Sequence, residues 1–100
     1  MLGGEGFVTL VIYDIRDDRL RFAVARVLRR FGLGRIQKSA FAGVISNATR
    51  VELVAALRRL LSGWSGYDVQ VFVIPPGSFA RRVVISEGYD LGGEGEDMLI

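Results

Sequence analysis

The residues best suited to chemistry are three aspartates that follow an apolar run. Asp14 stands at the end of this run, residues 7–13, and Asp17 and Asp18 come three and four positions later. The run is rich in β-branched and aromatic side chains, which predicts a strand buried on both faces. A carboxylate at the end of a buried strand is held rigidly by the sheet, so Asp14 is the first candidate for chemistry.

The composition limits what that chemistry can be. The 100 residues include no cysteine and no histidine, which excludes thiol nucleophiles, Ser-His triads, disulfides and zinc sites built from these residues. Carboxylate, tyrosine, hydroxyl and arginine groups remain, and carboxylates prefer hard divalent cations. We therefore expect any metal at Asp14 to be Mg²⁺ or Mn²⁺.

Charge is distributed unevenly along the chain. Residues 1–60 carry eleven basic and five acidic groups (11 − 5 = +6), whereas residues 61–100 carry two basic and six acidic groups (2 − 6 = −4). Of the thirteen basic residues only Lys38 is not arginine. This bias suits bidentate phosphate binding, and it equally fits base composition or growth at high temperature, so these explanations stay open.

Helical spacing begins immediately after the aspartates. Asp17 can cap this helix, Asp18 favours the positive end of its dipole, and Gly32 can close it in the left-handed conformation. The apolar residues that recur at helical spacing are Leu20, Val24, Val27, Leu28 and Phe31. The arginines on the remaining faces are Arg19, Arg21, Arg26, Arg29 and Arg30.

The rest of the chain predicts further strands and one more helix. Residues 34–45 alternate roughly by twos and predict two short strands with a bend near Lys38 or Ser39. A second helix is expected to start at Asn47 or Thr49 and to stop at Gly63. The later expected strands are residues 68–74, which end at a pair of prolines, and residues 82–86.

This order of elements predicts an α+β fold, a ferredoxin-like βαββαβ sandwich with an antiparallel sheet and both helices on one face. We expect one domain at residues 1–86, in which residues 75–86 form a hinge and an extra strand, and an acidic, glycine-rich flexible tail at residues 87–100. The other face of the sheet is also apolar, so a second copy of the chain is its expected cover. The apolar runs are too short to span a bilayer, which predicts a soluble cytoplasmic protein.

Three segments together resemble the Cas2 family of CRISPR-associated proteins. These are Tyr13-Asp14-Ile15-Arg16-Asp17-Asp18, the basic helix, and Gly32-Leu33-Gly34-Arg35-Ile36-Gln37-Lys38-Ser39-Ala40-Phe41-Ala42-Gly43. The resemblance covers residues 7–43. In addition, residues 79–85 are similar to the family's last strand, which crosses to the partner subunit.

The resemblance implies a homodimer that joins the Cas integrase in acquiring new spacers. It also implies metal-dependent endoribonuclease or DNA nuclease activity for some members. The family's metal-binding aspartate falls on Asp14, and the other positions implicated in activity fall on Tyr13, Arg21, Arg35 and Phe41. The chain departs from the pattern at two positions: Ala23 stands where some members have arginine, and Ala40 replaces the usual valine.

Structural roles compete with several of these assignments. Tyr13 and Phe41 can simply pack in the core, and Arg21 and Arg35 can be solvated or pair with aspartates instead of binding phosphate. Three functions stay open: a nucleic-acid-binding scaffold, a magnesium-dependent phosphodiesterase, and a toxin-type ribonuclease or small regulatory sandwich with no CRISPR link. For the scaffold, the nucleic acid is duplex DNA or single-stranded RNA. Its expected contacts are Arg19, Arg26, Arg29 and Arg30.

Overall fold

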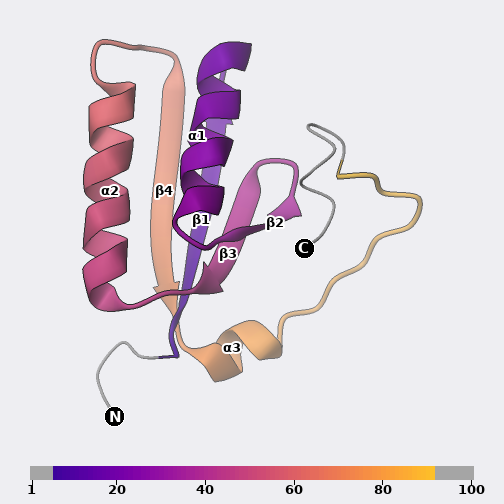
Figure 1. Ribbon diagram of the computed structural model, residues 1–100. Helices are drawn as coiled ribbons and strands as arrows, with labels where there is room; N and C mark the ends of the chain where they lie inside the picture. The colour runs from indigo at the N-terminus through magenta and orange to yellow at the C-terminus, as the bar shows by residue number, and fades with distance from the viewer. Residues whose placement is uncertain (1–5, 92–100) are drawn as a thin grey trace.

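The computed structural model describes residues 6–91, in which seven elements follow one another along the chain (Figure 1). Their order confirms the predicted succession of strands and helices as far as the strand expected at residues 68–74, and it adds a short helix, α3. The bounds are β1 Val8–Ile15, α1 Asp18–Arg30, β2 Gly34–Gln37, β3 Ala40–Val44, α2 Asn47–Leu61, β4 Tyr67–Ile74 and α3 Pro76–Ala80.

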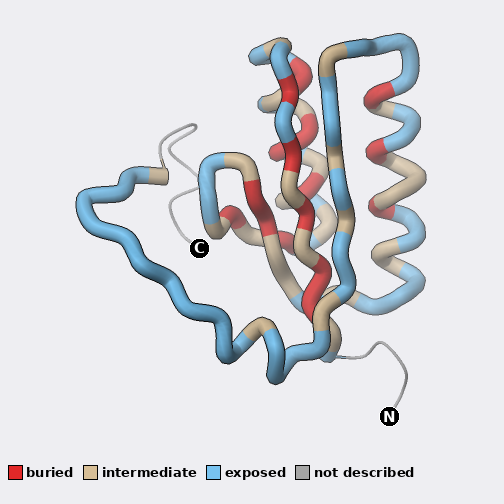
Figure 2. Tube along the Cα trace, turned by 180° about the vertical axis from the view of Figure 1, so that it is seen from behind, coloured by how far each residue is buried: buried red, intermediate tan, exposed pale blue. Residues whose placement is uncertain are grey.

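The four strands form one antiparallel sheet in the order β2-β3-β1-β4. Helices α1 and α2 cover one face, and the strands lie uncovered toward the viewer when the molecule is turned around (Figure 2). This arrangement confirms the ferredoxin-like sandwich. The bend predicted between the second and third strands is a turn at Lys38 and Ser39.

Side chains alternate across β1 and so divide it between two environments. Val11, Tyr13 and Ile15 face the helices and are buried in the core. The helices contribute most of the remaining core through apolar residues at helical spacing, chiefly Leu20, Val24, Leu28, Leu53, Leu57 and Leu61. On the opposite face, Leu10 and Ile12 are only partly buried, and their β4 neighbour Phe72 is 41% exposed.

Both long helices begin with a side-chain cap. The Asp17 carboxylate accepts a hydrogen bond from the Leu20 N–H at 3.0 Å, which confirms its predicted capping role. The second helix begins at Asn47, the earlier of its two predicted starts. There the Ser46 hydroxyl accepts from the Thr49 N–H at 3.0 Å, because Asn47 already belongs to the helix. Gly32, at φ +98°, follows α1 as expected, since glycine adopts this conformation without strain.

Residues 82–86 form neither helix nor strand within this chain. Val83, Val84 and Ile85 are 81%, 68% and 92% exposed. The sequence predicts that these residues pair with a second subunit, and that pairing stays a prediction. None of the helices within residues 6–91 is long and apolar enough to cross a membrane.

Replacing Asp17 by alanine is expected to lower the free energy of unfolding by about 1 kcal/mol, because the Leu20 N–H loses its acceptor. Urea denaturation measures the change. Asp17→Asn keeps an acceptor oxygen and is the control, expected to retain most of the stability. Equal losses in the two variants would contradict the capping role.

Candidate active site and nucleic-acid interface

The Asp14 carboxylate is exposed on the face of the sheet that the helices leave open. Its neighbours Tyr13 and Ile15 are buried under the helices, and alternation along β1 turns Asp14 the other way. The side chain is therefore accessible to solvent while its backbone is paired with β4. This position suits a metal ligand that must also meet a large substrate.

Asp68, which sequence analysis did not identify as a site residue, lies directly opposite Asp14. The two are partners in the β1–β4 register, so their side chains share the open face. The Gln70 side chain donates to Asp68 Oδ2 at 2.9 Å. The signal was available in part, since Asp68 opens the strand that the sequence predicts at residues 68–74, and a ferredoxin-like sheet pairs that strand with the first.

A cavity of about 240 Å³ adjoins these two carboxylates, and its lining adds Arg16, Gly66 and Tyr67. The Arg16 N–H donates to the Gly66 carbonyl at 3.0 Å, which fixes the end of β1 against the loop before β4. Like charges placed opposite each other repel, and Arg16 is the positively charged residue among those that line this cavity. Within residues 6–91, no three acidic side chains lie close enough together to hold a metal ion.

Tyr13, Arg35 and Phe41 come together, but on the covered face of the sheet. The Tyr13 and Phe41 rings stack with centroids 6.3 Å apart at 29°. The Arg35 guanidinium lies 5.2 Å from the centroid of the Phe41 ring, and all three residues are at most 5% exposed. They point away from the Asp14 carboxylate. In this chain their visible role is to pack β1, β2 and β3 against the helices.

Arg21 joins the start of α1 to the end of β1. It donates to the Ile15 carbonyl at 3.0 Å and pairs with Asp18 at 2.5 Å. Of the alternatives that the sequence left open for Arg21, the structure shows pairing with an aspartate. This contact holds the corner that carries Asp14 in place.

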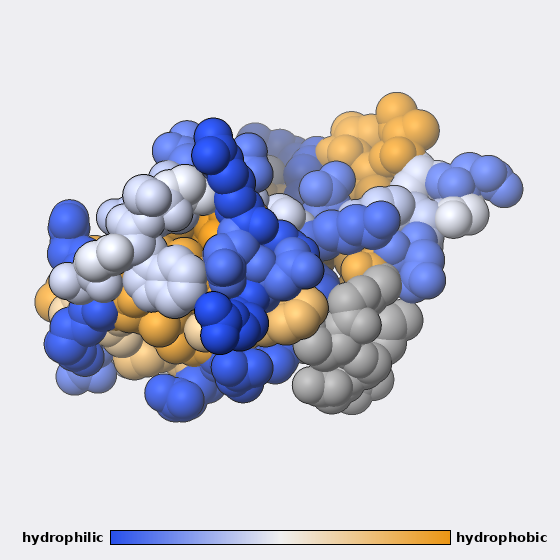
Figure 3. Space-filling view, turned by 90° about the horizontal axis from the view of Figure 1, so that it is seen from above, coloured by the Kyte–Doolittle hydropathy of each residue, from blue (hydrophilic) through white to orange (hydrophobic). Residues whose placement is uncertain are grey.

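The predicted nucleic-acid contacts lie on the outer side of α1. Arg19, Arg26 and Arg30 are exposed, and their spacing of seven and four residues aligns them along one side of the helix. Arg29 is partly buried beside them. Seen from above, the surface of the molecule carries a band of hydrophilic side chains between more hydrophobic areas (Figure 3). We call Arg19, Arg26 and Arg30 the arginine line.

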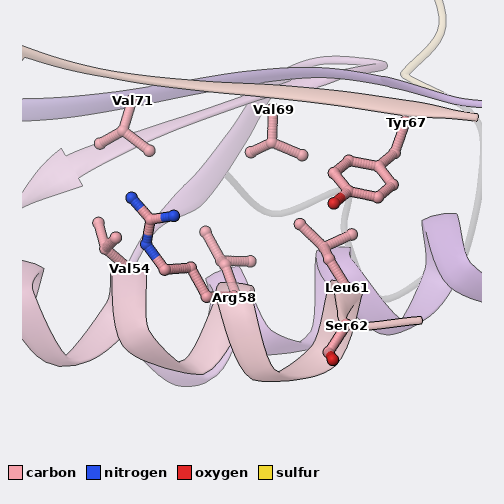
Figure 4. Close-up of a pocket in the computed structure, with 8 residues that line it drawn as sticks. Val54, Arg58, Leu61, Ser62, Tyr67, Val69 and Val71 are labelled. Atoms are coloured by element: carbon pink, nitrogen blue, oxygen red, sulfur yellow. The ribbon is translucent and has the colours of Figure 1, made fainter. Parts of the chain in front are cut away.

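An apolar groove of about 520 Å³ lies between α2 and the edge strand β4, away from Asp14 (Figure 4). Val54 and Leu61 of α2 face Val69 and Val71 of β4 across it. Arg58 and Tyr67 complete the lining with Leu57 and Ser62. The lining is mainly apolar, and Arg58, Ser62 and Tyr67 are its polar members.

Part of the predicted flexible tail, residues 87–100, contacts the folded domain. The Tyr89 hydroxyl accepts a hydrogen bond from the Lys38 N–H at 2.9 Å, and Lys38 Nζ lies 5.8 Å from the centroid of the Tyr89 ring. This contact places Tyr89 at the turn between β2 and β3. The rest of the predicted tail, residues 92–100, lies outside the described residues.

Comparison with known proteins identifies relatives along most of the chain. A CRISPR-associated endoribonuclease Cas2 of Chloroflexus aurantiacus is 40% identical over 81 residues, which is 81% of this chain and 94% of the relative. A Cas1/Cas2 endonuclease fusion of Thermoproteus tenax is 38% identical over 72 residues, which is 72% of this chain and 27% of the fusion.

A solved structure described as that of Cas2 shares the fold, with a TM-score of 0.67 at 24% identity, over 88% of this chain and 97% of that one. The family described as CRISPR associated protein Cas2 matches residues 7–82. That match includes every strand of the sheet, the Asp14 corner and the arginine line. The chain therefore belongs to the Cas2 family of CRISPR-associated proteins.

Proposed function

We propose that this chain acts as a homodimeric, nucleic-acid-binding component of the complex that acquires CRISPR spacers. The arginine line is the observation that carries the proposal, because it presents Arg19, Arg26 and Arg30 along one exposed side of α1. Arginine forks at this spacing can follow the phosphates of a duplex without reading its bases. The partner is a Cas1-type integrase, and the fused relative of Thermoproteus tenax supports this pairing. A cytoplasmic location is part of the same proposal.

Two surfaces support the dimer. The open face of the sheet carries apolar residues that no helix covers, including Phe72. Strand β4 stands at the edge of the sheet and leaves backbone groups on its outer side for pairing. The exposed segment Val83–Ile85 has the β-branched composition that fits such an edge, and its side chains would reach the groove between α2 and β4.

The dimer is expected to have a mass of about 22 kDa in solution, twice the 11.0 kDa of the chain (2 × 11.0 = 22.0). Light scattering at micromolar concentration measures it. Val84→Asp is expected to shift the species toward monomer, because a charge at the pairing strand would have to be desolvated. Ser86→Asp, an equally acidic change just beyond the apolar segment, is the control. A monodisperse parent near 11 kDa would contradict the dimer.

We further propose that Asp14 and the partner's Asp14 hold Mg²⁺ or Mn²⁺ across the two-fold axis of the dimer. A single carboxylate binds such a cation weakly, so the second subunit would complete the site. The bound metal would supply polarisation of a phosphate and a more acidic water. Asp68 adds negative charge on the same face, and Arg21 positions the corner.

The phosphodiesterase is thus the second candidate function beside the scaffold, and the Asp14 corner is the observation that favours it. The Chloroflexus relative is named an endoribonuclease, which supports single-stranded RNA as one substrate to test beside duplex DNA. A toxin-type ribonuclease or regulatory domain without a CRISPR link is less well supported, because the family match spans residues 7–82.

A further inference from the structure

A phenylalanine interrupts the arginine line. Phe22 is 39% exposed, whereas the buried side chains of α1 lie on its other side. Arg19 precedes it by three residues and Arg26 follows it by four, a spacing that brings these side chains together on one face. At about 1.5 Å of rise per residue, Phe22 stands about 4.5 Å from Arg19 and about 6 Å from Arg26 along the helix axis.

A third cation lies beside the same ring. The Arg21 guanidinium is 5.8 Å from the centroid of the Phe22 ring, while it donates to the Ile15 carbonyl at 3.0 Å. The contact through Arg21 links the ring to the end of β1, next to Asp14. An exposed aromatic ring is therefore surrounded by arginines at the end of the molecule that carries the candidate metal site.

This combination fits a ligand that carries regularly spaced anions and planar apolar faces. An unpaired strand of nucleic acid offers both, because its phosphates can meet arginines while its bases are free to stack on an aromatic side chain. The bases of a duplex are already stacked on one another and hide these faces. A ring contributes little to a surface that follows only duplex phosphates.

We propose that Phe22 is a stacking platform for an unpaired base, with Arg19 and Arg26 on the phosphates to either side of it. The inference rests on the proposed nucleic-acid binding and deepens it, because it names the residue that would hold an unpaired base, on a single strand or at the frayed or overhanging end of a duplex. Arg21 strengthens the site, since a guanidinium and an aromatic ring together can hold a base.

Fluorescence anisotropy with a labelled single-stranded oligodeoxynucleotide and a blunt duplex of the same sequence tests the proposal, in EDTA so that nothing is cleaved. Phe22→Ala is expected to weaken single-strand binding about 5- to 150-fold, because one base loses its stacking partner. The same variant is expected to change duplex binding less than about threefold. Phe22→Leu keeps the apolar volume without the ring and is expected to show the same loss. Phe22→Trp is expected to restore binding.

Two controls separate stacking from other effects. Val51→Ala removes an exposed apolar side chain from α2, where it is 69% exposed, and is expected to change neither affinity. An abasic strand keeps the phosphates without the bases, so the parent and Phe22→Ala are expected to bind it equally.

Two outcomes would overturn the inference: Phe22→Ala binding the single strand as tightly as the parent, or Phe22→Leu binding it as tightly as the parent. Neither outcome would contradict the proposed function, because that function depends on the arginines. If the parent binds no nucleic acid at all, the proposed function fails together with the inference. The duplex measurement on the parent distinguishes the two failures.

Discussion

Replacing Asp14 by asparagine is expected to abolish Mg²⁺- or Mn²⁺-dependent cleavage of RNA or DNA by the purified protein, a loss of at least about a thousandfold. The amide keeps the shape of the side chain but removes the charge that the cation needs, and a metal contributes several kcal/mol to such a reaction. Cleavage of labelled RNA and DNA measures the loss, with EDTA as the metal-free reference. The dimer should survive, because Asp14 is exposed and contributes nothing to the core.

Two other carboxylates make this test specific. Glu52 lies exposed on α2, so Glu52→Gln removes one charge from another part of the molecule than Asp14. It is expected to leave the cleavage rate unchanged. Asp68→Asn removes the charge opposite Asp14 and is expected to lower the rate by less than Asp14→Asn does. A highly purified Asp14→Asn protein that cleaves as fast as the parent would show that the activity belongs to another site or to a contaminant.

Removing arginines from the outer side of α1 is expected to produce the largest change in duplex affinity. If the dimer neutralises roughly four to eight phosphates, raising salt from 50 to 200 mM should weaken binding of the parent by about two to four decades. Arg26→Ala with Arg30→Ala should weaken binding at low salt. The slope of the logarithm of the binding constant against the logarithm of the salt concentration should also become shallower, by about 0.9 for each phosphate that the variant no longer neutralises. Anisotropy titrations at several salt concentrations measure both effects.

The matched control for these arginines is on the other helix. Arg59 is exposed in the last turn of α2, so Arg59→Ala removes one charge from a different surface and is compared with Arg26→Ala alone. We expect this control to keep most of the duplex affinity. One pair of results would contradict the scaffold proposal: the Arg26 and Arg30 variant binds DNA and supports spacer integration as well as the parent, while Asp14→Asn alone eliminates integration. The catalytic function would then be the better explanation.

Local sequence was sufficient for the order of the elements. The apolar run at residues 7–13, the period of two in residues 34–45 and the helical spacing from Leu20 onward depend only on which side chains avoid water. All three patterns are therefore readable without long-range information. The cap at Asp17 and the glycine at position 32 are equally local, and the structure confirms both. Sequence alone left the start of α2 between Asn47 and Thr49, because Ser46, Asn47 and Thr49 are all good capping residues and only the backbone conformation selects one.

The tertiary structure decided which of the candidate residues meet. Tyr13, Arg35 and Phe41 are separated from the Asp14 carboxylate by the sheet itself, because neighbours on a strand point to opposite faces and only packing of the helices determines which face is covered. The pairing of Asp14 with Asp68 depends on the register between two strands more than fifty residues apart in the sequence. No local pattern fixes such a register, since it is set where the apolar faces of distant strands are buried together. The sequence by itself therefore determined the elements, the fold class and the exposed charge of α1, whereas the sheet register and the covering helices determined that Asp14 stands with Asp68 on the open face.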